Sequence, residues 1–183
     1  SSGSRPEFAA AARQMGSELA RRGTGLVYGG GRVGLMGIVA DAALAAGGTV
    51  IGVIPRPLAT KELAHEGLTE LRIVETMHER KALMAQLSGA FIALPGGFGT
   101  LEEFCEVLTW AQLGLHRKPC ALLNVERFFD PLLSLFDHSV SEGFVMAEHR
   151  AMVLQARQSA PLLDAIDVWT PPNVKKWIDL EKS

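Results

Sequence analysis

The stretch that decides the fold reads Gly25-Leu26-Val27-Tyr28-Gly29-Gly30-Gly31-Arg32-Val33-Gly34-Leu35-Met36-Gly37. Apolar residues typical of a short buried strand lead directly into three glycines, and a segment typical of a helix follows from Gly34 to Ala46. Glycine allows backbone N–H groups to approach a phosphate or a ribose closely. The order of strand, glycine-rich turn and helix therefore predicts a turn that binds a nucleotide.

Outward from this stretch, the chain continues to alternate between strands and helices. The pattern predicts further strands over residues 49–54, 71–74, 90–94 and 119–124, and helices over residues 9–22, 76–87, 99–113, 131–142 and 161–166. Residues 56–67 are polar and are predicted to form a loop. The strands are continuously apolar, which is typical of a parallel sheet covered on both faces. We therefore expect a Rossmann-like, doubly wound α/β fold, with residues 1–183 forming a single nucleotide-binding domain.

Composition narrows the class of protein. A length of 183 residues fits one domain, and a hydrophobic content of 48% is enough to fill its core. The net charge of −2 gives no electrostatic reason to expect nucleic acid or an acidic membrane surface as a partner. The apolar runs are too short to span a bilayer, and no signal segment opens the chain. The two cysteines form no disulfide framework, so we expect a cytoplasmic protein.

A dinucleotide is the first alternative for the opening turn. Gly29, Gly31 and Gly34 satisfy the spacing of a dinucleotide-binding turn. An NAD site also needs an acidic residue at the end of the next strand, but that strand ends Val53-Ile54-Pro55-Arg56. A mononucleotide is therefore favoured over NAD, and a tight turn that binds nothing remains the other alternative.

A second glycine-rich turn reads Pro95-Gly96-Gly97-Phe98-Gly99-Thr100-Leu101-Glu102-Glu103. The first N–H groups of the helix that follows are unpaired, and the helix dipole is positive there, so Gly97, Gly99 and Thr100 are expected to hold a 5′-phosphate. Thr100-Leu101-Glu102-Glu103 also fits a capping box, in which Glu103 would only close the helix start. Two acids would repel a phosphate, whereas a carboxylate just beyond it could serve the ribose.

The third feature is the segment Thr76-Met77-His78-Glu79-Arg80-Lys81. Thr76 and Glu79 have the spacing of a capping box, which puts Arg80 and Lys81 near a helix start, where the dipole disfavours cations. Arg80 also shares a helical stripe with Met77, Met84 and Leu87. Such a cation favours an anionic ligand, with a structural ion pair or a snorkelling side chain as the alternative. The five histidines have no metal-ligand spacing.

Together these three motifs resemble the Lonely Guy family of cytokinin riboside 5′-monophosphate phosphoribohydrolases, which are often mislabelled lysine decarboxylases. The resemblance runs from about Arg5 to Asn124 and more loosely to Glu148. It implies a Rossmann-like fold, a homodimer, and hydrolysis of AMP or N6-modified AMP to free base and ribose 5-phosphate. A nucleotide monophosphate is the expected small-molecule partner, and the reaction needs no metal or organic cofactor.

The resemblance also assigns the site. The family's catalytic arginine and glutamate fall on Arg80 and Glu103. The expected substrate-binding residues are Gly30, Gly31, Met36, Glu62, Lys81, Gly97, Phe98, Gly99, Thr100 and Thr109. Breaking an N-glycosidic bond places positive charge on the ribose, so Glu103 is expected to stabilise this charge and to orient or deprotonate water. Arg80 is expected to anchor the nucleotide.

Family members usually begin with an apolar strand that ends in a Cys-Gly-Ser type of turn. Here only Ser1-Ser2-Gly3-Ser4 corresponds to this region, so the first strand is expected to be missing from this sequence. A protein without that central strand would expose the backbone of its neighbours.

Besides an NAD(P)-dependent oxidoreductase, which the missing acid at the end of the next strand argues against, two further functions stay open at this point. One is a non-catalytic nucleotide-binding protein. The other is a decarboxylase dependent on pyridoxal phosphate, which needs a lysine for a Schiff base. Lys81 lies in the segment already assigned to a nucleotide, and Lys61, Lys118, Lys175, Lys176 and Lys182 lie in or beside loops and the polar tail.

Overall fold

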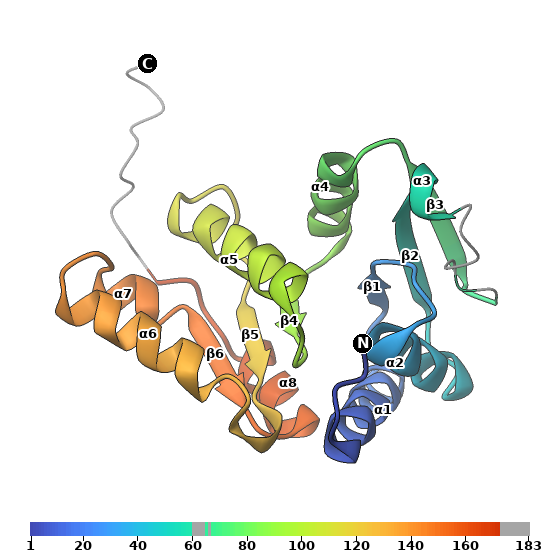
Figure 1. The fold of residues 1–183 in the computed structure, drawn as a ribbon, viewed down its shortest axis with the longest axis horizontal. Coiled ribbons are helices and arrows are strands. Elements are labelled where there is room, and N and C mark those ends of the chain that lie inside the picture. Colours follow the sequence, from blue (N-terminus) through green and yellow to red (C-terminus); the bar gives the residue numbers. More distant parts are fainter. Residues whose placement is uncertain (60–64, 66, 173–183) are drawn as a thin grey trace. The chain divides into compact units, whose positions relative to one another are not determined.

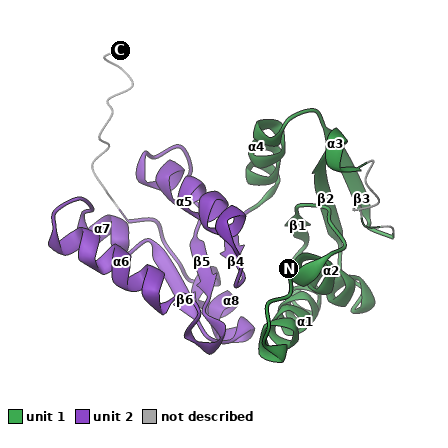
Figure 2. Cartoon of the chain, viewed as in Figure 1, with its two compact units in different colours: residues 1–88 green, residues 89–183 purple. Residues whose placement is uncertain are grey.

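The computed structural model describes residues 1–59, 65 and 67–172 (Figure 1). The chain divides into two compact units, residues 1–88 and residues 89–183, which Figure 2 colours separately. The prediction of a single domain stays a prediction, as does that of a missing first strand.

Unit 1 is a three-stranded parallel sheet with helices packed against it. Its strands are β1 (Leu26–Tyr28), β2 (Val50–Pro55) and β3 (Glu70–Val74), in the order β1-β2-β3. Its helices are α1 (Pro6–Arg21), α2 (Gly34–Ala45), α3 (Arg56–Leu58) and α4 (Met77–Leu87).

Helices α1 and α2 lie side by side (Figure 1). They approach closely because Gly16 faces α2: a Cβ at this position would collide with the Val39 carbonyl oxygen and would lie 2.9 Å from the Ala43 nitrogen. Val39 and Ala43 are themselves buried. The absence of a side chain at Gly16 therefore allows the two helices to pack as one layer. This layer supports the start of α2, where the first glycine-rich turn ends.

Unit 2 repeats the plan with a second parallel sheet, in the order β4-β5-β6. Its strands are β4 (Phe91–Ala93), β5 (Cys120–Leu123) and β6 (Val153–Ala156). Its α-helices are α5 (Phe98–Gln112), α6 (Asp130–Ser141), α7 (Ala147–Arg150) and α8 (Ser159–Asp167), and η2 (Val125–Arg127) is a short 3₁₀ helix. Phe104 from α5 and Phe129 before α6 pack with buried Leu122 of β5 in the core of this unit.

The structure confirms the predicted α/β class, with parallel sheets and Rossmann-like topology. Every helix and strand predicted by range is present to within a few residues at its ends. The predicted loop over residues 56–67 is wrong at its start, where Arg56–Leu58 forms a helical turn. Pro57 is compatible with this turn because proline is tolerated in the first turn of a helix.

Besides α3, the elements η2, α7 and β6 were not predicted. They have only three or four residues each, and β6 includes the polar Gln155, so none has a strong periodic pattern. Within the described residues, no helix is both long and apolar enough to cross a membrane.

Candidate active site

The first glycine-rich turn follows β1 in unit 1 and is tightly packed. Gly30 has a φ of +73°, and a Cβ there would lie 3.1 Å from the Cβ of Ile54 on β2. Gly37 faces the Arg32 carbonyl so closely that any side chain would collide with the backbone. Glycines at these positions are therefore required by the fold of the turn itself, whether or not a ligand is present.

Helix α4 begins with the capping box that the sequence predicts. The Thr76 hydroxyl accepts a hydrogen bond from the Glu79 N–H at 3.1 Å, and the Glu79 carboxylate accepts one from the Glu75 N–H at 2.9 Å. The Glu79 carboxylate thus accepts from the N–H of Glu75, the residue before the N-cap, and not from the N–H of Thr76, the N-cap residue. This start fixes Arg80 in the first turns of α4, as predicted.

The Arg80 side chain reaches back to the first glycine-rich turn. Its guanidinium lies so close to Gly29 that a Cβ on Gly29 would collide with it, and the Met36 sulfur would be 3.4 Å from the same Cβ. Arg80 Nη1 also donates to the Met77 sulfur at 3.3 Å. The fold therefore brings Arg80 to the stretch that contains Gly29 and Met36, so two parts of the predicted site that are distant in sequence lie together.

His65 is a residue of this region whose role was not predicted. Its N–H donates to the Gly30 carbonyl at 2.9 Å, and its Nε2 lies 2.8 Å from an Asp41 carboxylate oxygen on α2. His65 thus contacts the turn through its backbone N–H and α2 through its side chain. The sequence carried no signal for this, because His65 stands in a polar segment with no periodic pattern.

Arg56 follows the end of β2, where an NAD site would have its acidic residue. The Arg56 Nη2 lies 2.6 Å from one carboxylate oxygen of Glu75, and the Arg56 Nε donates to the same oxygen at 3.0 Å. The hydrogen bonds from Arg56 lower the pKa of Glu75. The residue that follows β2 is therefore an arginine and not an acid, and the neighbouring Glu75 carboxylate is paired with that arginine. An NAD ribose would find no free carboxylate in this pair, which is consistent with the preference for a mononucleotide.

The helix start at the second glycine-rich turn, in unit 2, rules out the alternative that Thr100 is an N-cap residue. Helix α5 begins at Phe98 with Gly97 as its N-cap residue, and the Leu101 N–H donates to the Gly97 carbonyl. Thr100 lies inside the helix, and its side chain packs back over Gly96. A capping box from Thr100 to Glu103 is therefore wrong, because the glycines allow the helix to start three residues earlier.

The glycines next to the helix start are open. A Cβ on Gly97 or on Gly99 would meet no described atom within 4 Å, and the Phe98 side chain is 93% exposed. By helix geometry, the N–H groups of the first residues of α5 have no partner within the helix. The positive end of a 15-residue helix thus faces an accessible surface, which suits an anion.

Glu103 lies three residues beyond Thr100 on α5, so the two side chains share one face of the helix, one turn apart. It is half-buried. Thr109 is six residues further, which is about 9 Å along the axis and roughly 120° around it. It is exposed, and its hydroxyl donates to the Cys105 carbonyl at 2.7 Å. The structure therefore groups Glu103 with the turn and leaves Thr109 on another face.

The predicted site residues are distributed over both units. Unit 1 carries Gly30, Gly31, Met36, Arg80 and the half-buried Lys81, and unit 2 carries Gly97, Phe98, Gly99, Thr100, Glu103 and Thr109. Glu62 lies outside the described residues. No group of three or more His, Cys, Asp or Glu side chains in the described part of the chain is arranged to hold a metal ion.

The parallel sheets and the helices packed against them define a Rossmann-like α/β protein. The family model described as "possible lysine decarboxylase" matches residues 36–166. A probable cytokinin riboside 5′-monophosphate phosphoribohydrolase of Oryza sativa subsp. japonica is 51% identical over 168 residues, which cover 92% of this chain and 75% of the relative. A cytokinin riboside 5′-monophosphate phosphoribohydrolase of Rhodococcoides fascians is 56% identical over 156 residues, which cover 85% and 79%. The chain belongs to this family, the Lonely Guy phosphoribohydrolases.

Solved structures support the fold alone. The molybdenum cofactor binding protein of Rippkaea orientalis superposes with a TM-score of 0.69 at 24% identity, covering 90% of this chain and 88% of that one. The molybdenum cofactor carrier protein of Chlamydomonas reinhardtii gives a TM-score of 0.67 at 22% identity, with the same coverage. At these identities the likeness extends to the arrangement of helices and strands.

Proposed function

We propose that the protein is a phosphoribohydrolase that cleaves the N-glycosidic bond of AMP or of N6-modified AMP, the cytokinin riboside 5′-monophosphates. The products are the free base and ribose 5-phosphate. The names of relatives about half identical in sequence support the reaction class. The observation that carries the proposal is the open start of α5, with Glu103 one turn inside the helix on the face of Thr100.

In this proposal the start of α5 holds the 5′-phosphate. Backbone N–H groups from Gly97 to Thr100 donate to the phosphate oxygens, and the helix dipole adds an attraction of the right sign. The open space around Gly97 and Gly99 supports this role, because neither glycine is required by packing within unit 2.

Glu103 is proposed as the catalytic carboxylate. As the bond between C1′ and the base breaks, its electron pair moves to the base and positive charge develops on the ribose. The carboxylate stabilises that charge and orients the water that adds to C1′. The proton released by the water ends on the departing base, so the reaction balances as a hydrolysis.

Arg80 and Lys81 are proposed as nucleotide-binding residues of unit 1. The guanidinium is held against Gly29 and the Met77 sulfur, so little conformational freedom remains to be lost when an anion binds. Glycine at position 29 supports this role, since any larger residue would displace the arginine. Gly30, Gly31, Met36, Glu62 and Thr109 complete the proposed set of substrate contacts.

We also propose that the enzyme is of the AMP nucleosidase type, acts as a homodimer and resides in the cytoplasm. Its two cysteines support a reducing compartment, since both are free thiols. Burial raises the pKa of the Cys120 thiol to about 12, which is unsuited to a reactive or catalytic thiol.

Incubation of the purified protein with AMP, isopentenyl-AMP, GMP and CMP tests the proposal. Chromatography of the products is expected to show adenine or isopentenyladenine together with ribose 5-phosphate, and much less release from the other two nucleotides. Binding of AMP without release of any base would support the non-catalytic alternative.

Arg80→Ala tests the role of the arginine. The variant is expected to lose kcat/KM for AMP, while adenosine, which lacks the phosphate, remains as poor a substrate as before. An unchanged kcat/KM for AMP would mean that Arg80 serves only the packing of α4 on the turn.

A further inference from the structure

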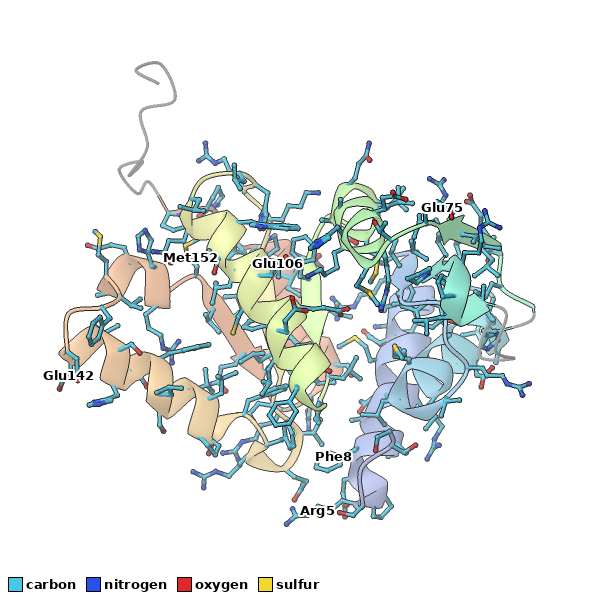
Figure 3. All side chains as sticks on the ribbon, turned by 45° about the horizontal axis from the view of Figure 1, so that its top comes forward. Arg5, Phe8, Glu75, Glu106, Glu142 and Met152 are labelled. Carbon is cyan, nitrogen blue, oxygen red and sulfur yellow. The ribbon has the colours of Figure 1, made fainter. Side chains whose placement is uncertain are left out.

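A pocket in unit 2 lies apart from Glu103 and the start of α5, and Thr109 is the one proposed substrate contact in its wall. It has a volume of about 160 Å³ and lies between α5, α6 and the segment from Val145 through α7 to β6. In Figure 3, Glu106 marks α5 and Met152 marks the connection from α7 to β6. The apolar part of its wall comes from Leu108, Phe136, Val145 and Val153.

His149 lines this pocket and differs from the rest of its wall in being a buried polar side chain without a hydrogen-bond partner among the described residues. Its side chain is buried, with 4% of the residue exposed, and neither ring nitrogen has a hydrogen-bond partner among the described residues. A neutral imidazole has one donor and one acceptor nitrogen, and leaving such groups buried and unpaired is costly. An unpaired imidazole in a pocket wall therefore points to a ligand that supplies a partner.

The other histidine close to the core of unit 2 shows the contrast. His116 Nε2 lies 2.8 Å from the Val107 carbonyl oxygen, and its Nδ1 accepts from the Lys118 N–H at 3.1 Å. Both of its nitrogens are satisfied by the backbone. Buried His65 in unit 1 lacks a partner only at Nδ1, because its Nε2 pairs with Asp41, so His149 differs from both in lacking partners at both nitrogens among the described residues.

Two polar side chains at the pocket are already engaged with the protein. The Thr109 hydroxyl donates to the Cys105 carbonyl at 2.7 Å, and Arg150 Nε donates to the Asp137 carboxylate at 2.7 Å. The Cys105 thiol and the Gln112 amide complete the polar part of the wall. Burial and the charge of Glu102 raise the pKa of Cys105, so its thiol adds no charge to the pocket.

The pocket is separate from the face of α5 that carries Glu103. Cys105, Leu108, Thr109 and Gln112 form one side of the helix, and at about 100° per residue Glu103 lies nearly opposite the centre of that side. A molecule in the pocket would therefore not touch the carboxylate of the same chain.

We infer that this pocket is a binding site for a small, uncharged aromatic ring that carries one hydroxyl, of the phenol class. The size follows from the volume, since an engineered apolar protein cavity of about 150 Å³ takes up benzene. The apolar wall contacts the ring, and His149 exchanges a hydrogen bond with the hydroxyl. This site goes beyond the proposed nucleotide reaction, with which it shares only Thr109, and its test does not depend on that reaction.

Phenol and toluene are the matched probes, because they have nearly the same shape and differ by one hydroxyl. Titration calorimetry of the full chain is expected to show phenol binding at least as tightly as toluene. In His149→Leu the hydroxyl would be buried without a partner, so the ratio of the two affinities should shift towards toluene by about tenfold. His138→Phe, which removes an exposed histidine, should leave the ratio unchanged.

A second measurement needs no substitution at His149. In the wild-type protein, nuclear Overhauser contacts are expected between the phenol ring protons and the methyl groups of Val145 and Val153. The absence of these contacts, failure of both probes to bind, or an equal affinity ratio in the wild type and in folded His149→Leu would overturn the inference. Each of these results would mean that water alone satisfies His149.

Discussion

The two glycine-rich turns look alike in sequence, yet their glycines are required for different reasons. In the first turn, Gly29 adjoins the Arg80 guanidinium, Gly30 has a positive φ, and Gly37 faces a backbone carbonyl. In the second turn only Gly96 is crowded, by the Thr100 side chain, and Gly97 and Gly99 face open space. Packing explains the first set, whereas no packing contact explains Gly97 and Gly99, for which we propose access for a ligand.

This difference separates two tasks. The first turn positions a cation, because its glycines allow α4 to place Arg80 against the end of β1. The second turn exposes the start of a helix, because its glycines leave the first N–H groups uncovered. A glycine that is crowded and a glycine that is open should therefore respond differently to the same substitution.

The largest effect is expected for Glu103→Gln, next to the second turn. The amide keeps the shape of the carboxylate but removes the negative charge that stabilises the positive charge developing on the ribose. The turnover number for AMP should fall about 10²-fold or more, with nucleotide binding retained. Glu102→Gln, an exposed neighbour on α5, is the matched control and should stay near the wild-type rate. Turnover of Glu103→Gln at the wild-type rate would remove Glu103 from the mechanism.

Gly29→Ala tests the crowded turn. The added methyl group collides with the end of a flexible side chain, so Arg80 should move while the fold stays intact. The expected loss in kcat/KM for AMP is roughly tenfold to a hundredfold, because small displacements of a positioned group are costly. Thermal unfolding should show little change in Tm. A variant with wild-type kinetics would show that the placement of Arg80 against Gly29 has no function.

Gly99→Ala tests the open turn, where stability and activity should change in opposite directions. Gly99 is in the first turn of α5 and has free space around it, so alanine should stabilise the helix by up to about 1 kcal/mol. The methyl group should at the same time obstruct the approach of a phosphate and weaken AMP binding by about tenfold. Calorimetric unfolding and AMP titration of the same sample check both signs. A more stable variant with unchanged AMP affinity would contradict the phosphate assignment.

Thr76→Ala is expected to have the smallest effect. It removes the cap that fixes the start of α4, which typically costs about 1 kcal/mol of stability. Arg80 keeps its contacts with Gly29 and Met77, so kcat/KM for AMP should change by less than the loss caused by Gly29→Ala. Urea unfolding gives the stability change. A larger kinetic loss than in Gly29→Ala would mean that the cap, and not the turn, positions the arginine.

The sequence predicted those features that follow from local rules. The strands around Val27 and Val53 are continuously apolar, and Thr76 and Glu79 have cap spacing, so both the α/β class and the start of α4 could be read directly. The cap from Thr100 was considered on the same grounds and is wrong, since adjacent glycines leave the exact start of a helix open to tertiary structure.

The remaining features depend on contacts between distant residues. The approach of Arg80 to Gly29 spans 51 positions and becomes visible only when α4 packs beside β1. The bond from His65 to Asp41 and the unpaired imidazole of His149 likewise have no local signature. Single-sequence patterns report periodicity and turn chemistry, and these contacts involve neither.

The most direct measurement of the central claim sets the two activities suggested for this family against each other in one protein preparation. Adenine release from AMP and carbon dioxide release from lysine with added pyridoxal phosphate are measured side by side. The account predicts release of adenine and ribose 5-phosphate, no visible absorbance from bound pyridoxal phosphate and no carbon dioxide above background. Lysine decarboxylation at a rate exceeding AMP cleavage would contradict it.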